Sequence, residues 1–343
     1  AGLELQKNYP QNIRSLKASD EFLSVATQRG VYVLNSVDSE ISSYVTTTSA
    51  QFYFNLNTAF FENNMLYLGT REFGLLKSTV ENIPNFEEVH PEGPVSNLPF
   101  SISVKENNLW VVYGGYDGAY APRNTAYSFD HFNGDTWINT PYKSFNVTNL
   151  VNITFDPNNI DKVYISSYGN GMLVVENNEV IEHWTHLNSG LEWRTRINGA
   201  AFDTEGNLWI ANSWVDKRIK KYGFDGSWSE FDMSSVMTNP ALGLGELIVD
   251  KTSNIWVASR RNGALIFNEN GNKKRALTTE STKGSLPDPN VRAIAADDNN
   301  RIWIGTQKGL VVLYNAATVL GDAIVDAEPI IILDESGIAK KLL

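Results

Sequence analysis

The chain has 343 residues, of which 42% are hydrophobic, and its formal net charge is −11. This negative surplus argues against nucleic acid as the main partner, because such binding depends on clustered Lys and Arg that neutralise phosphates. The absence of cysteine excludes a disulfide framework and a cysteine-based metal site. No apolar run reaches the roughly 18 residues of a membrane helix. The first residues lack the pattern of a signal peptide, so we expect any export signal to have been removed.

A short apolar strand that follows a polar turn recurs seven times along the chain. The residues at the centres of these strands are Ser24, Tyr67, Trp110, Tyr164, Trp209, Trp256 and Trp303. Their spacing lies between 43 and 54 residues, which is the period of a propeller blade. The sequence therefore predicts an all-β fold, a seven-bladed β-propeller of four-stranded antiparallel blades. We expect the central aromatic residues to pack between blades and not to serve as ligand platforms.

The first three blades diverge from the rest, and the third contains an insertion, Tyr113–Arg123, after its second strand. Long loops on a rigid scaffold are where binding residues tend to lie. We expect Tyr116 and Tyr120 to stack on a sugar ring and Arg123 to pair with an anionic group. In blade five, Trp214 and Lys217 occupy the equivalent loop and are candidates for the same role. The alternative is that the insertion packs on itself or against a neighbouring domain.

Blades four to seven follow the repeat more regularly. In blade seven, an inner strand over 290–296 precedes the polar turn 297–300, and strands over 301–306 and 310–314 follow. An aspartate recurs at the first hairpin turn of these four blades, at Asp156, Asp203, Asp250 and Asp297. Turn chemistry explains this position, because aspartate side chains accept hydrogen bonds from the turn backbone. The four carboxylates are spread around the ring, whereas a glycosidase needs two that converge on one sugar bond.

Polar residues begin several of the predicted inner strands. They are Arg14, Asn152, Asn198, Glu246 and Arg292. Because inner strands surround the propeller axis, we expect these side chains to reach the mouth of the central channel. Arg14, Asn198 and Arg292 are therefore further candidates for ligand binding. The alternative is that all five cap strand ends and form hydrogen bonds to water.

Two segments could complete blade seven and close the ring. One is Leu3–Gln6 near the N-terminus, and the other is Pro329–Leu333, which we favour as a partner for the strand 310–314. We expect a single propeller over residues 1–335. Residues 336–343 then begin a following segment, and the chain is expected to be part of a longer protein.

No catalytic constellation is visible. His183 and His186 lie three residues apart, so on a strand they point to opposite faces and would not share a metal ion. Nucleotide-binding and nucleophile motifs are absent. Two short basic clusters, 217–221 and 273–275, are typical of a solvated outer strand. The alternative is local binding of an anionic glycan. We expect a protein that is not an enzyme and that has no cofactor and no bound metal.

Blade seven resembles the two-component-regulator propeller repeat, which is common in proteins of Bacteroidetes. The residues that carry the resemblance are Leu286, Pro287, Asn290, Val291, Ile294, Asp297, Ile302–Thr306, Gly309 and Leu310. The resemblance is good for blades four to six and weak for blades one to three. It is more specific for the fold than for the function.

Two branches of this family are relevant. The divergent, Asn-rich blades and the segment 152–159 are similar to PorZ-type surface proteins of the type IX secretion system. That resemblance implies an envelope binding and assembly module that binds anionic lipopolysaccharide or another glycan and assists the sortase of that system. It also implies a place in the periplasm or at the surface of a Gram-negative cell. The alternative is an extracytoplasmic, polysaccharide-sensing propeller of a hybrid two-component regulator.

Overall fold

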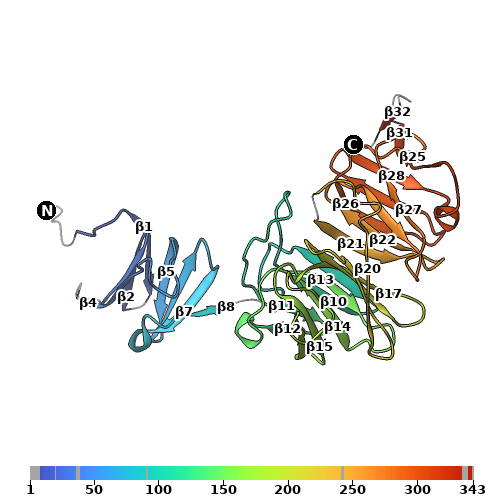
Figure 1. The fold of residues 1–343 in the computed structure, drawn as a ribbon. Helices are drawn as coiled ribbons and strands as arrows, with labels where there is room; N and C mark the ends of the chain where they lie inside the picture. The colour runs from blue at the N-terminus through green and yellow to red at the C-terminus, as the bar shows by residue number, and fades with distance from the viewer. Residues whose placement is uncertain are drawn as a thin grey trace. The chain divides into compact units, whose positions relative to one another are not determined.

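The computed structural model describes residues 8–19, 21–35, 39–89, 92–240, 243–333 and 339–341, and from residue 331 onward it describes the backbone alone. Within these ranges the regular structure is β-strand, apart from short 3₁₀ turns at Val80–Asn82, Tyr142–Ser144 and Ala316–Thr318. The all-β prediction is confirmed (Figure 1).

Seven four-stranded antiparallel sheets are present in the described part of the chain, one for each predicted repeat. In each sheet the strands follow one another in chain order from the inner to the outer strand, as in the blade of a propeller. The chain divides into two compact units, residues 1–93 and 94–343, which are described separately below.

The first unit contains blades one and two. Blade one consists of β1 (Ile13–Ser19), β2 (Phe22–Thr27), β3 (Gly30–Asn35) and β4 (Glu40–Val45), and blade two of β5 (Leu56–Glu62), β6 (Met65–Thr70), β7 (Leu75–Thr79) and β8 (Glu87–Val89). Ala26 and Val31 of blade one and Leu56 and Leu68 of blade two belong to one buried apolar cluster. The two blades therefore share a core.

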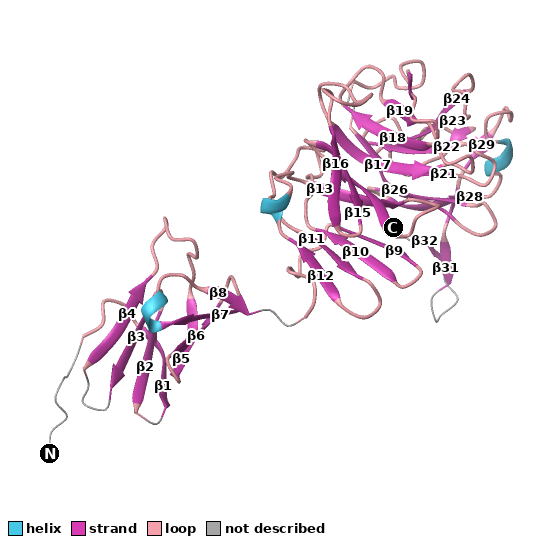
Figure 2. Cartoon of the chain, turned by 90° about the horizontal axis from the view of Figure 1, so that it is seen from below, coloured by secondary structure: helices cyan, strands magenta, loops and turns pink. Residues whose placement is uncertain are grey.

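The second unit contains the other five blades (Figure 2). Blade three consists of β9 (Ser101–Lys105), β10 (Asn108–Val112), β11 (Phe129–Phe132) and β12 (Trp137–Thr140); blade four of β13 (Leu150–Phe155), β14 (Lys162–Ser167), β15 (Gly171–Glu176) and β16 (Glu179–Trp184); and blade five of β17 (Arg196–Phe202), β18 (Leu208–Ser213), β19 (Ile219–Tyr222) and β20 (Trp228–Phe231). Blade six consists of β21 (Leu244–Val249), β22 (Ile255–Ser259), β23 (Ala264–Phe267) and β24 (Lys274–Leu277), and blade seven of β26 (Val291–Ala296), β27 (Ile302–Thr306), β28 (Gly309–Leu313) and β30 (Glu328–Pro329). The inner strands of successive blades contact one another.

The C-terminal segment supplies the outer strand of blade seven. Glu328 and Pro329 pair with Val312 and Val311 of β28, so the pairing begins one residue before the predicted segment. The following strand β31 (Ile331–Leu333) pairs instead with β32 (Ala339–Lys341), and a short parallel pair joins β25 (Lys283–Gly284) to β29 (Val325–Asp326). Leu3–Gln6 lies outside the described residues. The single propeller over residues 1–335 and the further segment from residue 336 therefore stay predictions.

In the second unit, the central aromatic residue of a blade packs against the blade that follows. Trp110 lies in a buried cluster with Leu150 and Ile153 of blade four, and Trp209 lies in one with residues of β21 to β23. Trp256 contacts a core that includes residues of β26 and β27. Tyr67 and Trp303 are only partly covered, and each lies in the last sheet of its unit. Where another blade follows in the same unit, the prediction that the central aromatic residue packs between blades is thus confirmed.

In blades five, six and seven the turn aspartate also accepts a hydrogen bond from the central tryptophan. The indole N–H of Trp209 donates to Asp203 Oδ2 at 2.8 Å, and that of Trp256 donates to Asp250 Oδ2 at 2.8 Å. The same bond joins Trp303 to Asp297 at 3.0 Å. The other carboxylate oxygen accepts backbone N–H groups of the turn, as at Asp250 from residues 252 and 254. One aspartate therefore fixes the turn and the tryptophan six residues later.

We expect the substitution Asp250→Ala to destabilise the second unit by about 2–3 kcal/mol, because it leaves the buried Trp256 N–H and the turn N–H groups without their charged acceptor. Urea unfolding followed by tryptophan fluorescence measures this change. Asp298→Ala is the matched control in an exposed turn, and we expect its effect to lie within about 0.5 kcal/mol. Equal effects of the two substitutions would contradict the anchoring role.

The same geometry predicts a pH dependence of stability. Burial opposes ionisation of Asp203, but hydrogen bonds from Asn207 and Trp209 outweigh it and lower the pKa of this carboxyl. A carboxyl with a lowered folded-state pKa contributes stability above its unfolded pKa of about 3.9, and that stability is lost as the pH falls through the folded-state pKa. We therefore expect the unfolding free energy to decrease below about pH 4, and to decrease less steeply in Asp203→Asn. An identical slope in both proteins would refute this assignment.

Candidate functional site

The inner strands begin with irregular pairing that redirects their polar residues. The register between β17 and β18 shifts between Ile197 and Ala200, and that between β26 and β27 shifts between Val291 and Ala293. Asn198 and Arg292 lie within these β-bulges. Glu246 lies in the corresponding shift of β21. Because a bulge re-aims side chains, three predicted strand-start residues leave the regular alternation of the sheet.

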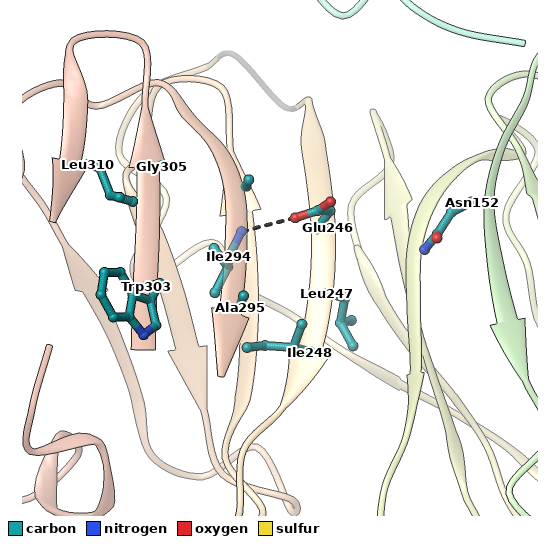
Figure 3. A pocket seen from close by; sticks show the side chains of 10 residues that line it. Asn152, Glu246, Leu247, Ile248, Ile294, Ala295, Trp303, Gly305 and Leu310 are labelled. Atoms are coloured by element: carbon teal, nitrogen blue, oxygen red, sulfur yellow. Dashed lines mark hydrogen bonds between the residues drawn. The ribbon is translucent and has the colours of Figure 1, made fainter. Parts of the chain in front are cut away.

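These residues line a cavity within the second unit. It has a volume of about 190 Å³ and is lined by Phe100, Ser101, Tyr116, Val151, Asn152, Asn198, Glu246 and Arg292. A second hollow of about 450 Å³ shares Asn152 and Glu246 with it and extends along β21 and β26 towards Trp303 (Figure 3). The inner-strand starts of blades four to seven therefore meet at one place, as the repeat predicts. Arg14 is exposed and lies in a β-bulge of β1 in the first unit.

The tyrosines of the insertion of blade three pack inward beside this cavity, whereas residues 117–119, 121 and 123 are exposed. Tyr116 is 7% exposed and Tyr120 is fully buried. Their rings stack with centroids 4.9 Å apart, and Tyr116 also contacts the ring of Tyr168 at 4.8 Å. The Tyr120 hydroxyl donates to the carbonyl oxygen of Val291 at 3.1 Å. The fully buried ring of Tyr120 leaves no face for a sugar to stack on, so this tyrosine supports the cavity wall.

Arg292 and Asn198 are held by the tyrosines of the insertion. The Arg292 guanidinium lies 4.8 Å from the ring centroid of Tyr120 and 5.7 Å from that of Tyr116, within the range of cation–π attraction. Asn198 Nδ2 donates to the Tyr116 hydroxyl oxygen at 2.6 Å. Burial raises the pKa of Tyr116, and the Asn198 bond and the Arg292 charge oppose this only in part. Tyr116 therefore stays a neutral phenol that places a polar group at the cavity.

Glu246 supplies the carboxyl group in the cavity lining. Its Oε2 accepts the backbone N–H of Ile294 at 3.0 Å, across the gap between β21 and β26 (Figure 3). The side chain keeps solvent-exposed surface, and the protein around its carboxyl group buries that group in part. This burial raises the pKa of the carboxyl, and the Ile294 N–H opposes the shift. The carboxyl group can therefore accept further hydrogen bonds from a bound molecule.

The remaining predicted residues lie outside the cavity lining. Arg123 is exposed at the end of the insertion. Trp214 donates its indole N–H to the Tyr168 hydroxyl at 3.2 Å. It therefore contacts the cluster of Tyr116, Tyr120 and Tyr168 through Tyr168. Lys217 is exposed and forms an ion pair with Glu230. The structure brings Tyr116, Tyr120, Asn198 and Arg292 together.

The expectation of a solvated strand is wrong for the basic cluster 217–221. Lys220 is fully buried on β19, the third strand of blade five, and its Nζ pairs with Glu192 at 3.0 Å and Glu230 at 2.9 Å. The loop before β17 and the outer strand β20 provide these carboxylates, a pairing that the local sequence does not reveal. The other cluster, 273–275, does reach the outer strand β24.

Histidine contacts in the described residues are structural. His131 stacks on Trp110 at 4.2 Å and forms hydrogen bonds to Asn108 and Asn178. His183 donates to the carbonyl oxygen of Asn170 at 2.6 Å, and His186 is exposed. Over the described part of the chain, no group of three His, Cys, Asp or Glu side chains is placed to hold a metal ion.

Comparisons with known proteins support the fold. Residues 285–308 match the family described as two component regulator propeller, the segment of blade seven in which the sequence shows that resemblance. No curated protein sequence matches the chain. The structure is similar to that of PorZ, described as an essential bacterial surface component of the type-IX secretion system of Porphyromonas gingivalis, with a TM-score of 0.72 and 20% identity. The match covers 96% of this chain and 47% of PorZ, so the chain spans about half the length of that protein.

Looser matches have TM-scores below 0.5. The extracellular domain of a hybrid two component system from B. thetaiotaomicron gives 0.48 at 18% identity, covering 98% of this chain and 44% of that one. An ancestral GH74 enzyme gives 0.49 at 15% identity, covering 96% and 48%. The fold is thus a β-propeller fold of four-stranded blades, and the resemblance to PorZ is confirmed at the level of structure.

The packing of the insertion gives a direct prediction. We expect Tyr120→Ala to destabilise the second unit by about 3–5 kcal/mol, the usual cost of removing a buried aromatic ring. Arg123→Ala, an exposed position in the same insertion, should change stability by less than about 0.5 kcal/mol. Thermal unfolding of both variants tests this difference, and a near-neutral Tyr120→Ala would show that the insertion is not part of the core.

Proposed function

We propose that the chain is a non-enzymatic binding and assembly module of the cell envelope that belongs to the accessory machinery of type IX secretion. The similarity to PorZ over 96% of the chain supports this proposal. In the proposal the module works outside the inner membrane, in the periplasm or at the surface of a Gram-negative cell. Its partners are anionic lipopolysaccharide or another glycan, and secretion proteins such as the sortase.

The chemistry of the cavity favours binding over hydrolysis. Its lining contains one carboxyl group, Glu246, together with the guanidinium of Arg292 and the carboxamides of Asn152 and Asn198. Glycoside hydrolysis ordinarily needs two carboxyl groups on either side of the scissile bond. A set with one carboxyl and several hydrogen-bonding groups can orient a polar ligand without cleaving it.

No helix in the described residues is long and apolar enough to cross a membrane.

A second candidate is the extracytoplasmic sensor half of a hybrid two-component regulator. The match of residues 285–308 to the two component regulator propeller family favours it. Both candidates use the propeller as a binding module, and they differ in the partner. A sensor recognises polysaccharide fragments, whereas the secretion module recognises lipopolysaccharide and secretion proteins.

We expect the purified chain to be retained on immobilised anionic lipopolysaccharide from a bacterium with type IX secretion, and to be eluted by free lipopolysaccharide of the same kind. A neutral polysaccharide resin of equal loading is the control. Co-purification with the sortase from the same envelope is the second readout. Absence of both retention and co-purification, with binding to polysaccharide fragments instead, would overturn the secretion proposal in favour of the sensor.

A further inference from the structure

The guanidinium of Arg292 carries a positive charge and forms no hydrogen bond to the described residues. Its guanidinium is fixed over the rings of Tyr116 and Tyr120, and its Nη1 is buried and has no hydrogen-bond partner in the structure. Arginine presents five N–H donors in a planar fork that fits a carboxylate or phosphate in bidentate fashion. A buried donor left without an acceptor costs about 1–3 kcal/mol. The two tyrosine rings therefore orient the Arg292 side chain, while its Nη1 lacks a hydrogen-bond acceptor.

Glu246 faces the same cavity with most of its bonding capacity free. Its Oε2 accepts one backbone N–H, from Ile294, whereas a carboxylate can accept about four hydrogen bonds. Among the described residues no ion pair joins Glu246 to Arg292, although both line the cavity. Burial raises the pKa of Glu246, which is the expected response of a carboxyl without a cationic partner. The cavity lining thus contains a carboxyl group and a guanidinium group that do not pair with each other.

Carboxamide and hydroxyl groups complete the lining. Asn198 is 3% exposed, and its Nδ2 is oriented by the Tyr116 hydroxyl oxygen at 2.6 Å. Asn152 and Ser101 face the cavity from the neighbouring inner strands. The volume of about 190 Å³ is smaller than the roughly 300–1,000 Å³ of pockets for drug-sized ligands. It suits a molecule of the size of one sugar or one amino acid.

We propose that this cavity binds a small organic carboxylate that carries a hydroxyl or ammonium group beside it, with the carboxylate on Arg292 and the neighbouring proton donor on Glu246. The inference deepens the proposed function and rests on it, since it assigns a ligand class to the binding module. Two sources share this chemistry, a sugar acid and an amino acid. A phosphate is less suitable, because its second negative charge would face the carboxyl of Glu246.

Isothermal titration of the whole chain with sodium glucuronate, glycine, glucose and inorganic phosphate tests the ligand class. We expect at least one of the two carboxylates to bind saturably, and glucose, the neutral counterpart of glucuronate, to bind at least tenfold more weakly. Binding of glucose as tight as that of glucuronate would overturn the proposal. So would the absence of saturable binding by both carboxylates, or tighter binding of phosphate than of either.

Variants test the two residues. We expect Arg292→Gln to weaken binding of the carboxylate at least tenfold, whereas Arg261→Gln, at an exposed arginine outside the cavity, should leave binding unchanged. Equal affinities of these two variants would refute the role of Arg292. If circular dichroism shows that Arg292→Gln does not fold, the comparison of glucuronate with glucose on the unmodified chain decides.

Glu246→Gln distinguishes the two sources. The amide retains an oxygen that can accept the Ile294 N–H or a ligand hydroxyl, but it has no charge for an ammonium group. We expect glycine binding to weaken at least tenfold and glucuronate binding to weaken by about threefold or less. Unchanged binding of both ligands would contradict the assigned role of Glu246. Retention on lipopolysaccharide is measured separately, so its persistence without small-carboxylate binding refutes this inference alone.

Discussion

The scaffold depends on the contact between the central aromatic side chain of one blade and the core of the next. Trp209 and Trp256 are fully buried between successive sheets, and each donates its indole N–H to the aspartate of the preceding turn. The large apolar surface drives the packing, while the charged hydrogen bond fixes the ring orientation. Successive blades of the second unit are thereby joined through shared apolar clusters. Blade three lacks the turn aspartate, and among the described residues the indole nitrogen of Trp110 has no hydrogen-bond partner.

This packing does not involve the polar residues at the starts of the inner strands, which leaves them available for other chemistry. β-Bulges redirect Asn198, Glu246 and Arg292 towards one cavity, and the insertion of blade three closes over it with Tyr116 and Tyr120. The tyrosines are therefore structural supports that orient Arg292 and Asn198. Glu246 and Arg292 keep unused bonding capacity at these strand starts, whereas Asp203, Asp250 and Asp297 already bond to the tryptophans of their blades.

Much of the fold follows from the sequence, because the period, the turn aspartates and the central aromatics are local features. The seven sheets and the outer strand from the C-terminal segment could be predicted in this way. The direction in which the insertion folds could not, since it depends on contacts such as Tyr120 with Val291, which lie 171 residues apart. The burial of Lys220 is a similar case, because Glu192 and Glu230 come from other segments. Glu246 could be found as a strand start, but its missing charge partner is visible only in three dimensions.

The central claim is that binding occurs at the bulged starts of the inner strands beside the insertion. Hydrogen–deuterium exchange of the chain with and without the lipopolysaccharide that retains it tests this most directly. The account predicts added protection in residues 113–123 and at the starts of β17, β21 and β26, with the outer strands β16, β20 and β24 unchanged. Protection confined to the outer strands, or to the hairpin turns that hold Asp203 and Asp250, would contradict it.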